Sequence, residues 1–172
     1  MNATEIWWIN RNQLKLYRYS FYLEYNDEPI WLDRADTIDV IDIVIAMDIS
    51  GSMLAKDLKP DRLNASKEIA IDFIKKRKND RIGLVVFAGE AFTQCPVTTN
   101  HESLINLFNQ IKFGMIDDGT AIGDAIGTSI NRLTDTIIKN RIIILITDGE
   151  NTSGNISPSF AADIAKNKAI KI

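Results

Sequence analysis

Residues that build disulfides and soft-metal sites are almost absent from this sequence of 172 residues. It has one cysteine, Cys95, so an internal disulfide and a multi-cysteine metal site are both excluded. Its one histidine, His101, argues against a histidine-rich metal site in the same way. A catalytic triad would depend on that single imidazole. Because Cys95 lies among apolar residues, we expect it to be a buried structural thiol.

Long hydrophobic runs are missing as well. The longest, at residues 43–47 and 142–146, fall far short of the roughly 18 to 20 residues that a transmembrane helix needs. The residues after Met1 do not have the pattern of a signal peptide. A formal net charge of -3 leaves no excess of positive charge for binding phosphates. We therefore expect this chain to be soluble and not to bind nucleic acid.

Strand and helix patterns alternate from residue 38 onward. The apolar runs at 43–47 and 81–88 predict buried strands, and residues 142–146 repeat the pattern. Amphipathic spacing predicts helices that start at Asp61, near His101 and after Thr120, and a fourth over residues 158–166. Residues 91–95 predict a short returning strand, and residues 169–172 the start of another. This alternation predicts an α/β fold with a doubly wound, mostly parallel sheet and helices on both faces.

Helical spacing also predicts some details of packing. It places Ile69 with Leu63 on the buried face of the first helix, and Phe160 on that of the last. Gly123 and Gly127 lie one turn apart in the helix after Thr120. We expect them to let that helix pack closely on the sheet.

Residues 1–37 form a separate segment rich in aromatic residues, with all three Trp and all four Tyr. Aromatic or apolar residues alternate with polar ones from Tyr17 to Tyr25, except at Tyr22. Residues 26–27 resemble a turn, and residues 30–32 can return as a second strand. We interpret this segment as a β-hairpin. Its rings either pack on the domain or form a membrane-proximal or partner-binding face. The expected organisation is this segment followed by one α/β domain at 38–172.

Short side chains with oxygen atoms follow two of the predicted strands and one loop. Because the carboxyl ends of parallel strands meet at one edge of a sheet, we expect these side chains to lie together. Carboxylate and hydroxyl oxygens are hard ligands, which favour Mg²⁺, Mn²⁺ or Ca²⁺ over zinc. The residues are Asp48, Ser50 and Ser52 after the first strand, Thr120 at a loop-to-helix junction, and Asp148 after the strand at 142–146.

These residues, as Asp48-x-Ser50-x-Ser52, Thr120 and Thr147-Asp148-Gly149, resemble the metal-ion-dependent adhesion site of von Willebrand factor A (VWA) domains. The resemblance covers residues 38–172 and implies a Rossmann-like fold. It implies that Ser50, Ser52 and Thr120 are hydroxyl ligands, and that Asp48 and Asp148 act directly or through bound waters. A Glu or Asp of a protein partner would complete the shell, because hydroxyl ligands leave the cation able to attract a carboxylate.

Longer stretches are similar to the bacterial aerotolerance (Bat-type) membrane proteins. They lie at residues 46–57, 60–63, 83–90, 92–96 and 118–123. The similarity implies a chaperone or assembly role, with other VWA proteins and a MoxR-type AAA+ ATPase as partners. It also implies a parent protein anchored in the bacterial inner membrane by segments absent here. Relative to that family the sequence ends early, so we expect the C-terminal strands and helix of the domain to be missing.

Parts of the sequence also resemble the site of an enzyme. A strand that ends in Asp also begins Mg²⁺-dependent phosphatases of the haloacid-dehalogenase type, in which Asp48 would be the nucleophile. Those enzymes usually carry a second acid two positions further on, whereas this chain has Ser50, which is no general acid at neutral pH. A metal-free interaction module and acids that merely cap loops are further alternatives. We predict a chain that is not an enzyme and has no small-molecule substrate.

Overall fold

The computed structural model describes residues 22–25, 28–31, 40–134 and 138–172. The chain divides into two units, Met1–Asp39 and Val40–Ile172. In the first, strands β1 (Tyr22–Tyr25) and β2 (Glu28–Trp31) pair antiparallel, with Tyr22 opposite Trp31. The rest of the predicted hairpin, residues 17–21 and Leu32, lies outside the described residues. The division into a segment 1–37 and a domain 38–172 stays a prediction.

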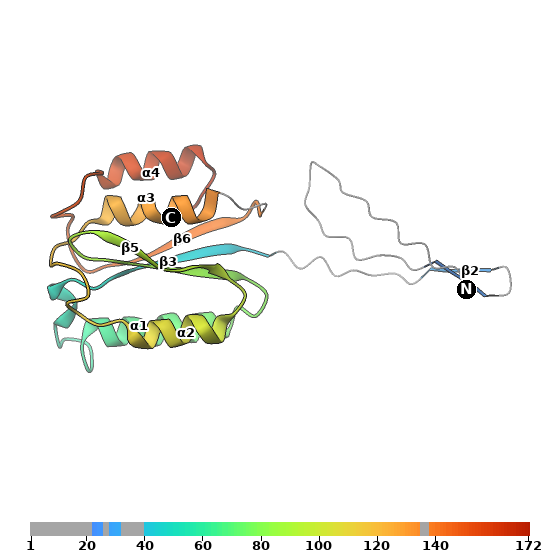
Figure 1. The fold of residues 1–172 in the computed structure, drawn as a ribbon, viewed down its shortest axis with the longest axis horizontal. Helices are drawn as coiled ribbons and strands as arrows, with labels where there is room; N and C mark the ends of the chain where they lie inside the picture. Colours follow the sequence, from blue (N-terminus) through green and yellow to red (C-terminus); the bar gives the residue numbers. More distant parts are fainter. Residues whose placement is uncertain (1–21, 26–27, 32–39, 135–137) are drawn as a thin grey trace. The chain divides into compact units, whose positions relative to one another are not determined.

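A four-stranded sheet in the order β5-β4-β3-β6 forms the centre of the second unit (Figure 1). Strand β3 (Asp42–Asp48) has β4 (Arg81–Phe87) and β6 (Arg141–Ile146) on its two sides, both parallel to it. Strand β5 (Ala91–Thr98) pairs antiparallel with β4. Beyond β6, Lys171 forms a parallel bridge with Ile142, as predicted for a strand starting at 169–172.

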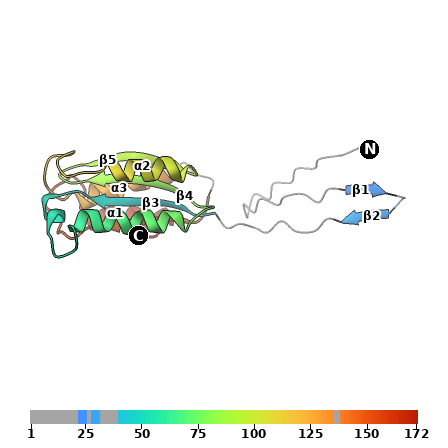
Figure 2. The ribbon, with the colours of Figure 1, turned by 90° about the horizontal axis from the view of Figure 1, so that it is seen from below.

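Helices cover both faces of this sheet (Figure 1). Helices α1 (Arg62–Lys75) and α2 (His101–Gln110) lie side by side on one face, as Figure 2 shows from below. Helices α3 (Ile122–Thr134) and α4 (Pro158–Asn167) cover the other, and the short 3-10 helix η1 (Gly51–Leu54) follows β3. The predicted α/β class with a mostly parallel, doubly wound sheet is confirmed. In the part of the chain that the structure describes, no helix is long and apolar enough to span a membrane.

The alternation of side chains along β3 explains why the sheet needs two layers of helices. Ile43, Ile45 and Met47 belong to a core cluster with residues of α1 and α2, whereas Val44 and Ala46 belong to a second cluster with α3 and α4. Every residue of β3 is buried. Most of β6 is only half-buried, because it has a full strand on one side and a single bridge on the other. Cys95 is buried as predicted.

Two predicted core positions are wrong. Ile69 of α1 is 68% exposed, because the buried stripe of that helix runs through Leu63, Ala70 and Ile74. Phe160 of α4 is 60% exposed, because this helix packs through two alanines one turn apart, Ala161 and Ala165. In both helices the apolar pattern is wider than the face that meets the core.

Candidate metal centre

Asp48 forms the base of the candidate site. It is the last residue of β3 and its side chain is fully buried. One carboxylate oxygen accepts a hydrogen bond from the backbone N–H of Ser50 at 2.8 Å, and the other accepts one from the Thr147 hydroxyl at 2.6 Å. These two bonds connect the loop after β3 with the loop after β6, so Asp48 is held in one orientation.

A chain of hydrogen bonds leads from this base toward solvent. The hydroxyl oxygens of Ser50 and Ser52 lie 3.0 Å apart, and the Ser52 hydroxyl donates to Oδ1 of Asp148 at 2.8 Å. Asp148 follows β6, which runs parallel to β3 beside it, so both strands deliver their acids at the same edge. Four of the five residues predicted from the sequence are thus within hydrogen-bonding distance of one another along this chain.

Thr120 adjoins the same group of oxygens. Its backbone N–H donates to the Thr152 hydroxyl at 3.1 Å and its carbonyl accepts from the Thr152 N–H at 3.0 Å. A methyl group placed on Gly149 would meet Thr120 Oγ1 at 3.4 Å and Ser52 Oγ at 3.9 Å. Both hydroxyls therefore lie against the backbone that follows Asp148. The structure brings all five predicted residues to one edge of the sheet.

Asp118 connects two of the converging loops, and sequence reasoning missed it. Its Oδ1 accepts from the N–H of Gly51 at 2.8 Å and from the N–H of Gly119 at 3.0 Å. Gly119 has a φ of +139°, and a Cβ there would lie 2.3 Å from Ser153 Oγ, so only glycine fits. Asp118 thereby fixes the loop of Ser50 and Ser52 relative to the loop of Thr120.

Replacing Asp118 by alanine should loosen the junction of these loops. The charge-assisted bonds to two N–H groups are lost, and we expect a loss of about 1 kcal/mol in the free energy of unfolding, since the site is exposed. Cation affinity should fall about tenfold. The matched control is Asp117→Ala, which removes the same charge from the adjacent exposed residue and should change affinity less than twofold. Equal effects in the two variants would show that only charge matters here.

Arg62, the first residue of α1, reaches this edge from outside. Its Nη1 forms an ion pair with Oδ2 of Asp148, and its Nε and Nη2 each donate at 2.8 Å to the Asp57 carboxylate. These hydrogen bonds to Arg62 lower the pKa of Asp57 below its usual value. No pattern in the sequence indicates this contact, because Arg62 and Asp148 are 86 residues apart in the chain.

The donor set fits a hard divalent cation. Within the described residues no three Asp, Glu, His or Cys side chains converge to hold a metal, so hydroxyl oxygens have to complete a cation site. Three hydroxyls and two carboxylates supply oxygen ligands only, and carboxylate oxygens that accept one hydrogen bond retain further lone pairs. Exposure rises from fully buried Asp48 to the 15% exposed side chain of Asp148. The site therefore opens to solvent at its outer end.

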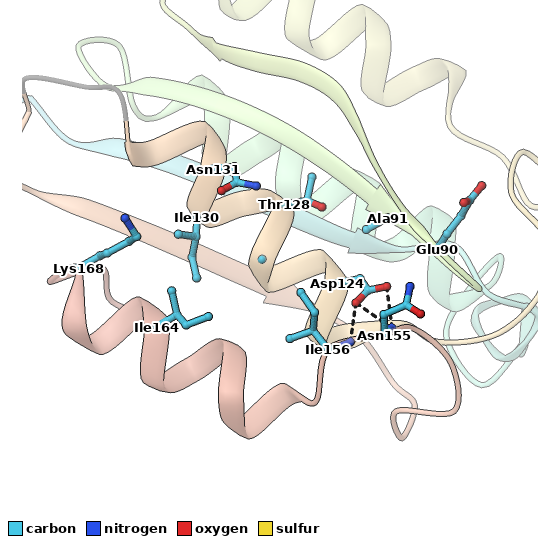
Figure 3. Close-up of a pocket in the computed structure, with 11 residues that line it drawn as sticks. Glu90, Ala91, Asp124, Thr128, Ile130, Asn131, Asn155, Ile156, Ile164 and Lys168 are labelled. Atoms are coloured by element: carbon cyan, nitrogen blue, oxygen red, sulfur yellow. Dashed lines mark hydrogen bonds between the residues drawn. The ribbon is translucent and has the colours of Figure 1, made fainter.

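A separate groove lies between α3 and α4 (Figure 3). Its volume is about 470 Å³, and none of the five predicted ligands lines it. Asp124 points toward it, but its carboxylate accepts hydrogen bonds from the backbone N–H groups of Asn155 and Ile156 at 3.1 and 2.9 Å. This acid holds the segment before α4, and the groove is not the candidate site.

His101 lies far from the candidate site. Its Nε2 lies 2.8 Å from the carbonyl oxygen of Asp80, the residue before β4. The carboxyl end of β4, opposite Asp48, is Phe87, about 20 Å away at 3.3 Å per residue. The single imidazole of the chain is therefore out of reach of Ser50 and Ser52, which excludes a serine–histidine nucleophile.

Comparisons with known proteins agree with the fold. The sequence model of the von Willebrand factor type A domain matches residues 43–150. The crystal structure of BatB from Bacteroides thetaiotaomicron is 40% identical, with a TM-score of 0.71 over 76% of this chain and 63% of that one. An aerotolerance-related membrane protein from Bacteroides fragilis is 38% identical, with a TM-score of 0.71 over 76% and 64% of the two chains. The predicted similarity to Bat-type proteins is confirmed.

Two further proteins resemble this chain at lower sequence identity. An uncharacterized protein of Borreliella burgdorferi is 36% identical over 132 residues, which are 76% of this chain and 39% of that protein. The chain thus spans well under half the length of this curated relative. Proximal thread matrix protein 1 of the mussel byssus, whose MIDAS motif is occupied by zinc, shares the fold, with 21% identity and a TM-score of 0.68 over 77% and 34% of the chains. From the match over residues 43–150 and these structural neighbours, we conclude that this chain belongs to the von Willebrand factor type A domain family.

Proposed function

We propose that this chain is a divalent-cation-dependent protein-interaction domain, in which Asp48, Ser50, Ser52, Thr120 and Asp148 hold Mg²⁺, or alternatively Mn²⁺ or Ca²⁺. The observation that supports it best is the line of hydrogen bonds from buried Asp48 through the two serines to Asp148. Together with Thr120, these side chains form a set of oxygen ligands that opens to solvent. The cation, when bound, supplies a point of positive charge for a Glu or Asp of a protein partner.

The charge and burial of each proposed ligand suggest its role in holding the cation and presenting it to a partner. Asp48 is held at the base by the Thr147 hydroxyl and the Ser50 N–H, so it fixes the loop that carries both serines. Ser50, Ser52 and Thr120 offer neutral oxygens, which compensate none of the formal charge of a cation. Asp148 stands at the outer end, where a partner would approach. This distribution favours recognition of an acidic group over chemistry on it.

The role of the whole protein is also a proposal. Because solved relatives include BatB and an aerotolerance-related membrane protein, we place the chain in a Bat-like aerotolerance or assembly protein. Its parent would be anchored in the bacterial inner membrane by segments outside this chain. Other VWA proteins and a MoxR-type AAA+ ATPase are the partners that this assignment implies.

Calorimetric titration of Mg²⁺ and Mn²⁺ into the purified chain tests the proposal directly. We expect saturable binding at one site, with Zn²⁺ titrated in parallel because the mussel relative holds zinc. A folded chain, verified by circular dichroism, that binds none of these ions would contradict the proposal. If binding occurs, Thr120→Ala should weaken both cation binding and cation-dependent capture of the partner, whereas a metal-free interaction module would be indifferent to this change.

The phosphatase alternative finds little support in the geometry. A nucleophilic Asp48 would need room for a phosphate ester beside its carboxylate, but its side chain is fully buried. Ser50 stands where the second acid would be required. We expect no hydrolysis of an aryl phosphate in the presence of Mg²⁺. Turnover that disappears in Asp48→Asn would refute the interaction function in favour of an enzyme.

A further inference from the structure

The Arg62 guanidinium is shared between two carboxylates of unequal importance to the site. One is Asp57, in the loop before α1, 56% exposed and bound by both Nε and Nη2. The other is Asp148, a proposed cation ligand, bound by Nη1 alone. Arg62 therefore binds Asp148 through one nitrogen and Asp57 through the other two.

This arrangement places a permanent positive charge where a divalent cation would need negative charge. Oδ1 of Asp148 accepts from Ser52 and Oδ2 pairs with Arg62, so both of its oxygens are engaged in the structure. Arg62 is 33% exposed, so its charge is only partly screened by water. A cation that approaches Asp148 meets repulsion from the guanidinium and has to take over a carboxylate that the guanidinium neutralises.

We propose that Arg62 is an internal competitor of the divalent cation, which sets the affinity of the site. Without the cation, Arg62 neutralises Asp148. When the cation is bound, Arg62 releases Asp148 and remains bound to Asp57, which already accepts hydrogen bonds from two of its nitrogens. The exchange needs no rearrangement of the backbone, only a shift of the end of the side chain. This inference rests on the proposed function, because it assigns Arg62 a role in the affinity of that same site.

The test is calorimetric titration of Mg²⁺ and Mn²⁺ into Arg62→Gln beside the wild-type chain. Removal of the competing charge should tighten binding about tenfold at low ionic strength, and the difference should shrink at high salt. The matched control is Arg77→Gln, which removes the same charge about 20 Å away, beyond the other end of α1. Arg77 pairs with Asp80, so its loss should leave cation affinity unchanged.

Asp57 supplies an independent arm of the test. Asp57→Asn removes the alternative carboxylate partner of Arg62. The guanidinium should then bind Asp148 more tightly, and cation binding should weaken. In the Arg62→Gln background, Asp57→Asn should reduce the cation affinity clearly less than it does in the wild-type chain. This comparison distinguishes an effect that acts through Arg62 from the simple loss of a nearby negative charge. Unchanged or weaker binding by folded Arg62→Gln, while the wild-type chain binds, would overturn the inference alone. Absence of binding by both folded variants would overturn the proposed function with it.

Discussion

Replacement of Asp48 by asparagine should weaken divalent-cation binding by at least about 100-fold, an effect larger than is usual for residues that only support a ligand. The change removes a charge from the base of the site with almost no change in volume. The amide oxygen can still accept one of the two hydrogen bonds that Asp48 receives from Ser50 and Thr147. Calorimetric titration of Mg²⁺ and Mn²⁺ measures the loss, and thermal unfolding verifies that the fold persists.

Strand β3 itself supplies the matched control. Asp42 begins the strand that Asp48 ends, is equally buried, and lies 3.2 Å from Nε of Arg81 at the opposite edge of the sheet. Asp42→Asn should lower stability, because it leaves the arginine without its partner, but it should not change the affinity for cations. If Asp48→Asn bound Mg²⁺ as the wild-type chain does, Asp48 would be no more than a loop cap. If both variants lost binding equally, the effect would reflect general destabilisation.

Local patterns in the sequence are enough to predict most of the fold and the five candidate ligands. Continuous apolar runs identified β3 and β4 because buried strands need both faces apolar, and oxygen-bearing residues right after such runs identified the edge where ligands gather. The sequence predicts a helix that starts at Asp61, and the Asp61 side chain does cap α1 by accepting a hydrogen bond from the N–H of Asn64 at 2.8 Å. Each of these features depends on neighbours close in the chain.

The features that the sequence did not show depend on contacts between distant segments. Asp118 bonds to Gly51 across 67 residues, and Arg62 reaches Asp148 across 86, and no spacing rule relates such pairs. Exposure of Ile69 and Phe160 has the same origin, because the width of a buried helix face is set by the partner that covers it. A motif can therefore name the ligands of a site without naming the residues that orient them or compete for them.

Replacement of Gly123 by alanine should lower the free energy of unfolding by about 3 kcal/mol or more. A Cβ on Gly123 would lie 1.8 Å from the carbonyl oxygen of Ile156, far inside van der Waals contact with a backbone atom. The carboxylate of Asp124, the next residue, already accepts a hydrogen bond from the N–H of Ile156. This bond holds α3 and the segment before α4 together, so neither can move apart to relieve the clash without losing stability. The close approach predicted for Gly123 is therefore real, but it is made to this segment and not to the sheet.

Gly127→Ala is the control for this effect, one turn further along the same helix. Its Cβ would meet only the end of the Ile156 side chain, at 3.2 Å, and alanine favours the helix by up to about 1 kcal/mol over glycine. We expect the stability of this variant to stay within about 1 kcal/mol of the wild-type chain in urea unfolding. The clash at Gly123 also bears on the metal centre, because the segment before α4 continues from Thr152 and Ser153, whose N–H groups bind the carbonyl of Thr120. Gly123→Ala should thus weaken cation binding even where the variant folds, and a folded variant of unchanged stability and affinity would show that the two segments are not rigidly joined.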